Sequence, residues 1–136
     1  MIVLVDTPVW WLALRRRPTN LSSQEQRLTA ILAELVREGR IRLLGSTRQE
    51  VLSGIREQAA FNRIREALRA FEDVPVTSND FEEAARISNE CRRSGIASTS
   101  TDMLLCAVAL SQNWQILTTD LDFPQYAKIV PIQMFS

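Results

Sequence analysis

The chain contains no histidine and only two cysteines, Cys91 and Cys106. The absence of histidine excludes His-based catalytic triads, acid–base catalysis by paired histidines and histidine-rich metal sites. The cysteines do not form a C-x-x-C motif, and one isolated pair does not make a disulfide framework, so we expect buried free thiols in a reducing cytoplasm. Any catalysis must therefore rely on carboxylates, hydroxyls, arginine or a hard metal ion.

Glycine is scarce, and long apolar runs are missing. Glycine occurs at positions 39, 45, 54 and 95 alone, so the phosphate-binding loops G-x-G-x-x-G and G-x-x-x-x-G-K cannot be written. No apolar run approaches the roughly 20 residues that span a membrane. The apolar start at 2–5 is interrupted at once by Asp6, which is unlike a signal peptide. We expect neither a membrane protein nor a dinucleotide-binding or P-loop protein.

The charges balance, with 16 basic and 16 acidic residues and a formal net charge of zero. A protein that coats nucleic acid non-specifically is normally basic, so any nucleic-acid contact here must be local. All the basic residues except Lys128 are arginine, whose guanidinium suits bidentate binding of phosphate. Arg48 and Arg56 flank Glu50 in the sequence and are the stronger candidates for contacts with a phosphate substrate.

The pattern of apolar residues predicts an α/β domain. The chain has 136 residues, 46% of them hydrophobic, which is typical of one globular domain covering 1–136. We predict strands at 2–5, 41–44, 115–118 and 128–131, and helices at 9–12, 28–36, 45–55, 61–71, 81–91 and 103–110. Strands that alternate with helices favour a mostly parallel sheet with helices on both faces.

Four acidic residues fall at corresponding places in this pattern. Asp6 follows the first strand, and Asp120 follows the third. Glu50 and Asp102 lie in the first turns of predicted helices. Because ligands bind at the carboxyl ends of parallel strands, we expect the four side chains at one edge of the sheet.

Each acid also has a purely structural interpretation. Asp6 can cap the helix after Pro8, and Asp120 can form a turn. Glu50 and Asp102 can each form a capping box with the threonine three residues earlier. These pairs are Thr47 with Glu50 and Thr99 with Asp102. Against this, carboxylates about 6 Å apart repel by roughly 3 kcal/mol at an effective dielectric near 20. Such a cluster either raises pKa values or binds a divalent ion, and an all-oxygen donor set favours Mg²⁺ or Mn²⁺ over Zn²⁺.

Four segments together resemble the acidic motifs of PIN-domain ribonucleases. They are VLVDTPVW at 3–10, QEVLSG at 49–54, STDMLLCA at 100–107 and LTTDLDF at 117–123. The resemblance extends over essentially the whole chain, and the short form is most similar to VapC-type toxins of toxin–antitoxin pairs. It departs from the family pattern at Pro8, where Ser or Asn is more common, and at Cys106, where Ala is common.

This resemblance implies a three-layer α/β/α sandwich and a Mg²⁺- or Mn²⁺-dependent endoribonuclease that leaves a 5′-phosphate. The residues that match the four acidic positions are Asp6, Glu50, Asp102 and Asp120, with Asp122 as a further ligand and the hydroxyls of Thr7 and Thr118 beside the site. The implied partners are an RNA substrate, a cognate antitoxin docked in an apolar groove, and a second copy of the chain in a homodimer.

Other function classes fit the sequence less well. A receiver domain needs two adjacent acids after the first strand and a lysine after the last good strand, whereas Asp6 stands alone and Lys128 precedes the last strand segment. A non-catalytic binding module of the same fold would be marked by a missing acid, and all four are present. Enzymes of this fold that act on DNA flaps or in ribosomal-RNA maturation usually have longer chains.

Overall fold

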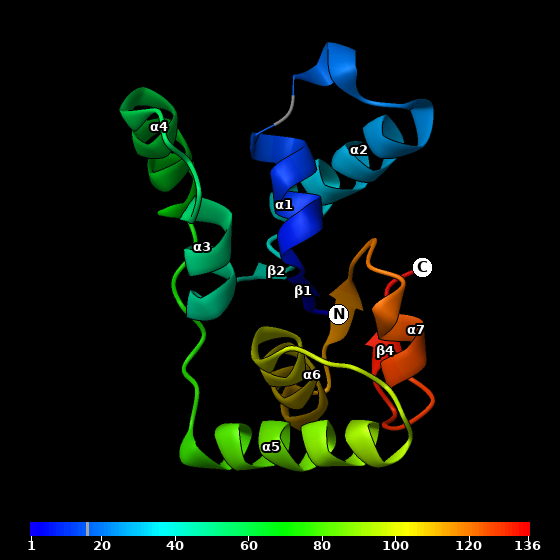
Figure 1. Ribbon diagram of the computed structural model, residues 1–136. Coiled ribbons are helices and arrows are strands. Elements are labelled where there is room, and N and C mark those ends of the chain that lie inside the picture. Colours follow the sequence, from blue (N-terminus) through cyan, green and yellow to red (C-terminus); the bar gives the residue numbers. More distant parts are fainter. Residues whose placement is uncertain (16) are drawn as a thin grey trace.

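The computed structural model describes residues 1–15 and 17–136, and a parallel sheet lies at its centre (Figure 1). The strands are β1 (Val3–Val5), β2 (Ile41–Arg42), β3 (Gln115–Leu117) and β4 (Gln133–Met134). Their order is β2-β1-β3-β4, and every pairing between them is parallel. This confirms the predicted mostly parallel α/β fold and brings the carboxyl ends of β1 and β3 side by side.

Helices connect the strands. Within the described ranges they are α1 (Thr7–Leu14), the 3₁₀ turn η1 (Pro18–Asn20), α2 (Ser23–Arg37), α3 (Gly45–Leu52), α4 (Gln58–Leu68), α5 (Ser78–Arg93), α6 (Ser100–Gln112) and α7 (Asp122–Tyr126). No helix in this part of the chain is long and apolar enough to cross a bilayer. Arg15 and Arg17, which follow α1, are exposed, and Arg16 lies outside the described residues.

Side chains that alternate along β1 separate the core into two halves. Val3 and Val5 pack with residues of α1, α2, α3 and α4, whereas Leu4 packs with α5, α6 and α7. Successive side chains of a strand point to opposite faces of its sheet, so a fully apolar strand needs cover on both sides. Figure 1 shows α5 and α6 on one side of the sheet and α1 and α2 on the other, which confirms the three-layer sandwich.

The helix predicted at 103–110 corresponds to α6, and most residues of that range are buried. The residues buried in it are Met103, Leu105, Cys106, Ala107, Val108 and Ala109. Thr99 begins the helix as its N-cap, with its side chain accepting a hydrogen bond from the backbone of Asp102. Both cysteines are buried free thiols, as expected.

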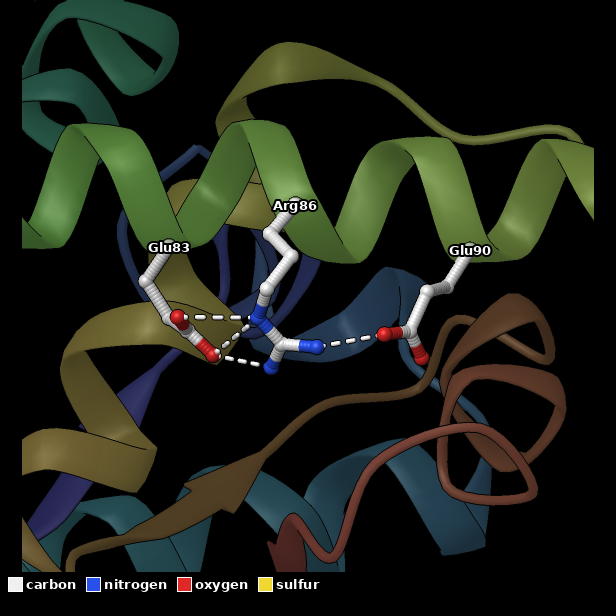
Figure 2. Close-up of polar contacts among 3 residues, drawn as sticks. All are labelled: Glu83, Arg86 and Glu90. Atoms are coloured by element: carbon white, nitrogen blue, oxygen red, sulfur yellow. Dashed lines mark hydrogen bonds and ion pairs between the residues drawn. The ribbon is translucent and has the colours of Figure 1, made fainter.

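Helix α5 covers α6 and presents a charged outer face. Arg86 lies between Glu83 and Glu90 on this face and forms ion pairs with both (Figure 2). The Arg86 side chain is 50% exposed, and exposed ion pairs contribute about 0–1 kcal/mol each. These pairs favour the helix modestly and lie outside the acidic cluster described below.

The strand predicted at 128–131 was placed wrongly. Strand β4 lies further along the chain, and its Met134 pairs with Ile116 of β3. The backbone amides of Ile129 and Val130 instead donate to Tyr126 O at the end of α7. The apolar segment therefore forms the turn that ends α7. The sequence did not reveal this helix, because five residues are too few to show helical periodicity.

Candidate metal centre

Asp6 lies at the junction of β1 and α1. Its backbone amide donates to Leu117 O at 2.9 Å, which continues the pairing of β1 with β3. Its side chain caps α1 by accepting from the amide of Thr7 at 2.9 Å, and Thr118 Oγ1 donates to its other oxygen at 2.8 Å. Asp6 is 5% exposed, so burial raises its pKa, and these two hydrogen bonds lower it in part. Negative charges on Glu50 and Asp120 raise the pKa further.

Asp120 lies in the loop between β3 and α7. The loop is closed by local hydrogen bonds: the amide of Asp120 donates to Thr118 Oγ1 at 3.0 Å, and the amide of Asp122 donates to Asp120 Oδ1 at 2.9 Å. The hydroxyl of Thr118 therefore contacts both Asp6 and Asp120.

Asp102 lies in the first turn of α6. Its Oδ2 accepts a hydrogen bond from the hydroxyl of Tyr126 at 3.0 Å. Burial and, to a smaller extent, the negative charge of Asp6 raise the pKa of Asp102 to about 6, even though the hydrogen bond from Tyr126 acts in the opposite direction. Half of the predicted capping box is present, because Thr99 caps the helix while the Asp102 carboxylate bonds to Tyr126.

These three aspartates form one cluster, which we call the acidic cluster. One carboxylate oxygen from each of Asp6, Asp102 and Asp120 lies within 4.8 Å of the other two. Carboxylates this close repel one another, and the raised pKa values of Asp6 and Asp102 reflect both burial and that repulsion. An all-carboxylate donor set fits a hard divalent ion such as Mg²⁺ or Mn²⁺.

Glu50 lies outside that group of three, although its charge acts on Asp6. It lines a hollow together with Trp11, Ser46 and Thr101. The capping box that the sequence suggested for Glu50 and Thr47 is wrong. Helix α3 begins at Gly45 after Leu44, without a side-chain cap. Thr47 thus lies inside the helix, and Glu50 has no capping role.

Thr7 and Tyr126 each donate a hydrogen bond to a carboxylate of the acidic cluster, Thr7 through its backbone amide and Tyr126 through its hydroxyl. The hydroxyl of Thr7 is buried and has no hydrogen-bond partner among the described residues. The sequence suggested Thr7, since it follows Asp6 in the first motif, but nothing in it suggested Tyr126. The link between Tyr126 and Asp102 depends on α7, which the sequence did not predict either.

The two arginines singled out by the sequence have different surroundings. Arg48 Nε donates to Asp73 at 2.8 Å and Arg48 Nη1 to Leu68 O at 3.0 Å, and a further bond reaches Phe71 O. These bonds tie α3 to the end of α4 and leave its guanidinium occupied within the protein. Arg56 is exposed and makes no hydrogen bond or ion pair with any residue that the structure describes.

An apolar hollow of about 800 Å³ lies next to Asp120. Its lining includes Trp11, Leu28, Pro124 and Phe135. Trp11 is 40% exposed, whereas the neighbouring Trp10 is 3% exposed, so one indole lies in the core and the other faces outward.

Comparisons with known proteins give one consistent family. The family model described as PIN domain matches residues 3–129. No curated protein matches the chain in sequence.

Solved structures share the fold at low sequence identity. FitAcB from Neisseria gonorrhoeae is 21% identical with a TM-score of 0.76, and the match covers 99% of this chain and 97% of that chain. VapBC2 from Rickettsia felis, bound to a DNA fragment from its promoter, is 14% identical with a TM-score of 0.74, covering 100% and 98%. VapBC-5 from Mycobacterium tuberculosis, a member of the VapBC family of toxin–antitoxin systems, is 18% identical with a TM-score of 0.69, covering 99% and 98%. With a family model matching residues 3–129 and three acidic motifs converging at the carboxyl edge of the sheet, the chain belongs to the PIN-domain family.

Proposed function

We propose that this protein is a Mg²⁺- or Mn²⁺-dependent endoribonuclease, and that it is the toxin of a type II toxin–antitoxin pair. The observation that supports the proposal is the acidic cluster, in which three carboxylates from distant parts of the chain lie within 4.8 Å of one another. The carboxylates of such a cluster repel one another, which destabilises the fold. A bound divalent cation would neutralise this charge and so account for the arrangement. Residues 1–136 act as a single PIN-like domain.

The residues have distinct roles in this proposal. Asp6, Asp102 and Asp120 hold the ion, while Glu50 and Asp122 serve as further or outer ligands. A divalent ion in such a site polarises the scissile phosphate and lowers the pKa of a bound water. Thr118 keeps Asp6 and the loop of Asp120 in register through its two hydrogen bonds. Arg56 is the better candidate for a contact with the RNA backbone, because Arg48 is bound internally.

The toxin assignment draws on the solved structures that share the fold. They include VapBC and FitAB complexes, and VapBC-5 is described as part of a toxin–antitoxin system. The apolar hollow beside Asp120 is a suitable place for an antitoxin helix, since amphipathic helices bind in apolar grooves. We further propose a homodimer, and a cytoplasmic location, where RNA is available and free thiols persist.

The function is tested by incubating the purified protein with a mixed pool of RNA. Reactions contain Mg²⁺, Mn²⁺ or EDTA, and a parallel set uses D102N. We expect cleavage with either metal, 5′-phosphate ends on the products, and no cleavage with EDTA or D102N. Cleavage in EDTA, or equal cleavage by D102N, would overturn the catalytic assignment. Absence of any cleavage by wild-type protein that binds Mn²⁺ would favour a binding module instead.

A further inference from the structure

Tyr126 is the one tyrosine of the chain, and its side chain is 0% exposed. A buried phenol hydroxyl must find a hydrogen-bond partner, because leaving it unpaired away from water is costly. The partner that Tyr126 has is a carboxylate of the acidic cluster: its hydroxyl donates to Asp102 Oδ2 at 3.0 Å. The hydroxyl of a side chain buried in the apolar core is thus a hydrogen-bond donor to one oxygen of Asp102.

The ring of Tyr126 is held firmly enough to place that donor. It packs edge-to-face against Phe123, with ring centroids 5.2 Å apart and planes at 71°. Both rings belong to α7 and are buried in the core cluster that also contains residues of α5 and α6. The hydroxyl therefore has little freedom to follow Asp102 if that side chain turns.

Helix α7 is connected to a second member of the acidic cluster at its beginning. The amide of Asp122 donates to Asp120 Oδ1 at 2.9 Å, and the amide of Phe123 donates to the backbone oxygen of Asp120 at 3.2 Å. One short helix consequently contacts Asp120 through its first residues and Asp102 through Tyr126. The helix is placed to set the position of the two carboxylates relative to each other.

We propose that Tyr126 is a positioning residue of the metal centre, whose hydroxyl holds the carboxylate of Asp102 in the orientation that an ion shared with Asp6 and Asp120 requires. The proposal rests on the metal site of the proposed function. A hydrogen bond to a ligating carboxylate orients it, and removing such a bond typically lowers metal affinity or activity about 10–100-fold. Tyr126 itself touches neither the ion nor the substrate.

A purely structural role would give a different result. If the bond simply fastened α7 to α6, its loss would lower stability and leave metal binding unchanged. Helix α6 offers a matched control, because Ser111 Oγ donates to Asp80 Oδ1 of α5 at 3.2 Å. This is also a hydroxyl-to-carboxylate bond and its acceptor Asp80 is buried, although Ser111 itself is exposed, and it lies outside the acidic cluster. S111A removes this bond together with the contact of the same hydroxyl with Val108 O at 3.2 Å, and therefore measures what loss of a bonded hydroxyl on α6 does away from the acidic cluster.

The test compares Mn²⁺ binding by wild type, Y126F and S111A, using calorimetry and the electron paramagnetic resonance of free Mn²⁺. Thermal unfolding is recorded for each so that binding is measured on folded protein. We expect Y126F to bind Mn²⁺ about 10-fold more weakly than wild type, and S111A to bind it with wild-type affinity. Equal affinity of folded Y126F and wild type would overturn the proposal. Failure of wild type to bind Mn²⁺ would instead overturn the metal site of the proposed function.

A second measurement does not depend on a variant that folds. Because the chain has one tyrosine, incorporation of 3-fluorotyrosine gives a single fluorine resonance, from position 126. We expect titration with diamagnetic Mg²⁺ to shift this resonance, with the same affinity that calorimetry reports for Mg²⁺. A resonance that stays unchanged while Mg²⁺ binds would show that the hydroxyl does not sense the metal centre, and would overturn the proposal.

Discussion

The hydroxyl of Thr118 donates a 2.8 Å hydrogen bond to Asp6, a residue 112 positions away in the chain. The same oxygen accepts from the amide of Asp120 at 3.0 Å. Thr118 thus joins the ends of β1 and β3, which are neighbours in the sheet. Two of the three aspartates in the acidic cluster depend on this one side chain for their relative position.

Replacing Thr118 tests this connection. T118V keeps the shape of the side chain but removes both hydrogen bonds, so we expect the free energy of unfolding to fall by about 1–3 kcal/mol. We also expect RNA cleavage to fall about 10-fold or more, as is usual when a group that orients a metal ligand is lost. T118S restores the hydroxyl and should recover most of both properties. Wild-type activity in T118V would show that the bonds do not matter for catalysis.

The metal-free protein should lose stability as the pH rises through the titration of Asp102. Its pKa is raised from 3.8 to about 6 in the folded state, so between these values the folded protein keeps a proton that the unfolded chain has released. The folded state binds more protons in this window, and its stability therefore falls with rising pH, then levels off above about pH 6.

D102N isolates this contribution because asparagine does not titrate. Thermal unfolding in EDTA from pH 4 to pH 8 should show the stability of wild type decreasing relative to D102N across the window. Parallel curves for the two proteins at every pH would contradict the prediction.

Divalent metal should reverse the loss of stability. A ligand that binds the folded state alone stabilises it by about 2.7 kcal/mol when present at 100 times its dissociation constant. We therefore expect Mg²⁺ or Mn²⁺ at pH 7.5 to raise the melting temperature of wild type. D6N should lack this increase, since the asparagine can still cap α1 through its carbonyl oxygen but contributes no negative charge. A similar increase in both proteins would place the binding elsewhere.

Substitution of Arg48 should lower the stability of the protein, whereas substitution of Arg56 should weaken RNA binding. R48A removes the bonds to Asp73, Leu68 and Phe71, so we expect it to lower the free energy of unfolding by about 1.5–3 kcal/mol. R56A should leave stability within about 0.5 kcal/mol, as is usual for exposed sites, and should weaken RNA binding with a smaller salt dependence. Chemical denaturation and filter binding with D102N as background measure both properties. A stability loss in R56A, or unchanged RNA affinity, would refute this assignment.

Local patterns in the chain account for much of the fold. The apolar run of β1 and the all-round apolar character of α6 each signal burial on every side, and both elements are found in the core. Three of the four acidic motifs have their acid at a strand end or in a first helical turn, whereas Glu50 lies beyond the first turn of α3. Asp6 and Asp102 are positioned in this way by their own neighbours in sequence, through the caps at Asp6 and Thr99.

Contacts between segments that are distant in the chain determine the remaining features of the candidate site. Glu50 has a motif as recognisable as the others, yet it lies outside the group of three aspartates. Arg48 is recruited by partners on another part of the chain, and Tyr126 reaches Asp102 through a five-residue helix. No local pattern encodes such pairings, because hydrophobic periodicity reports which side of an element is buried and carries no information on which distant group it will meet.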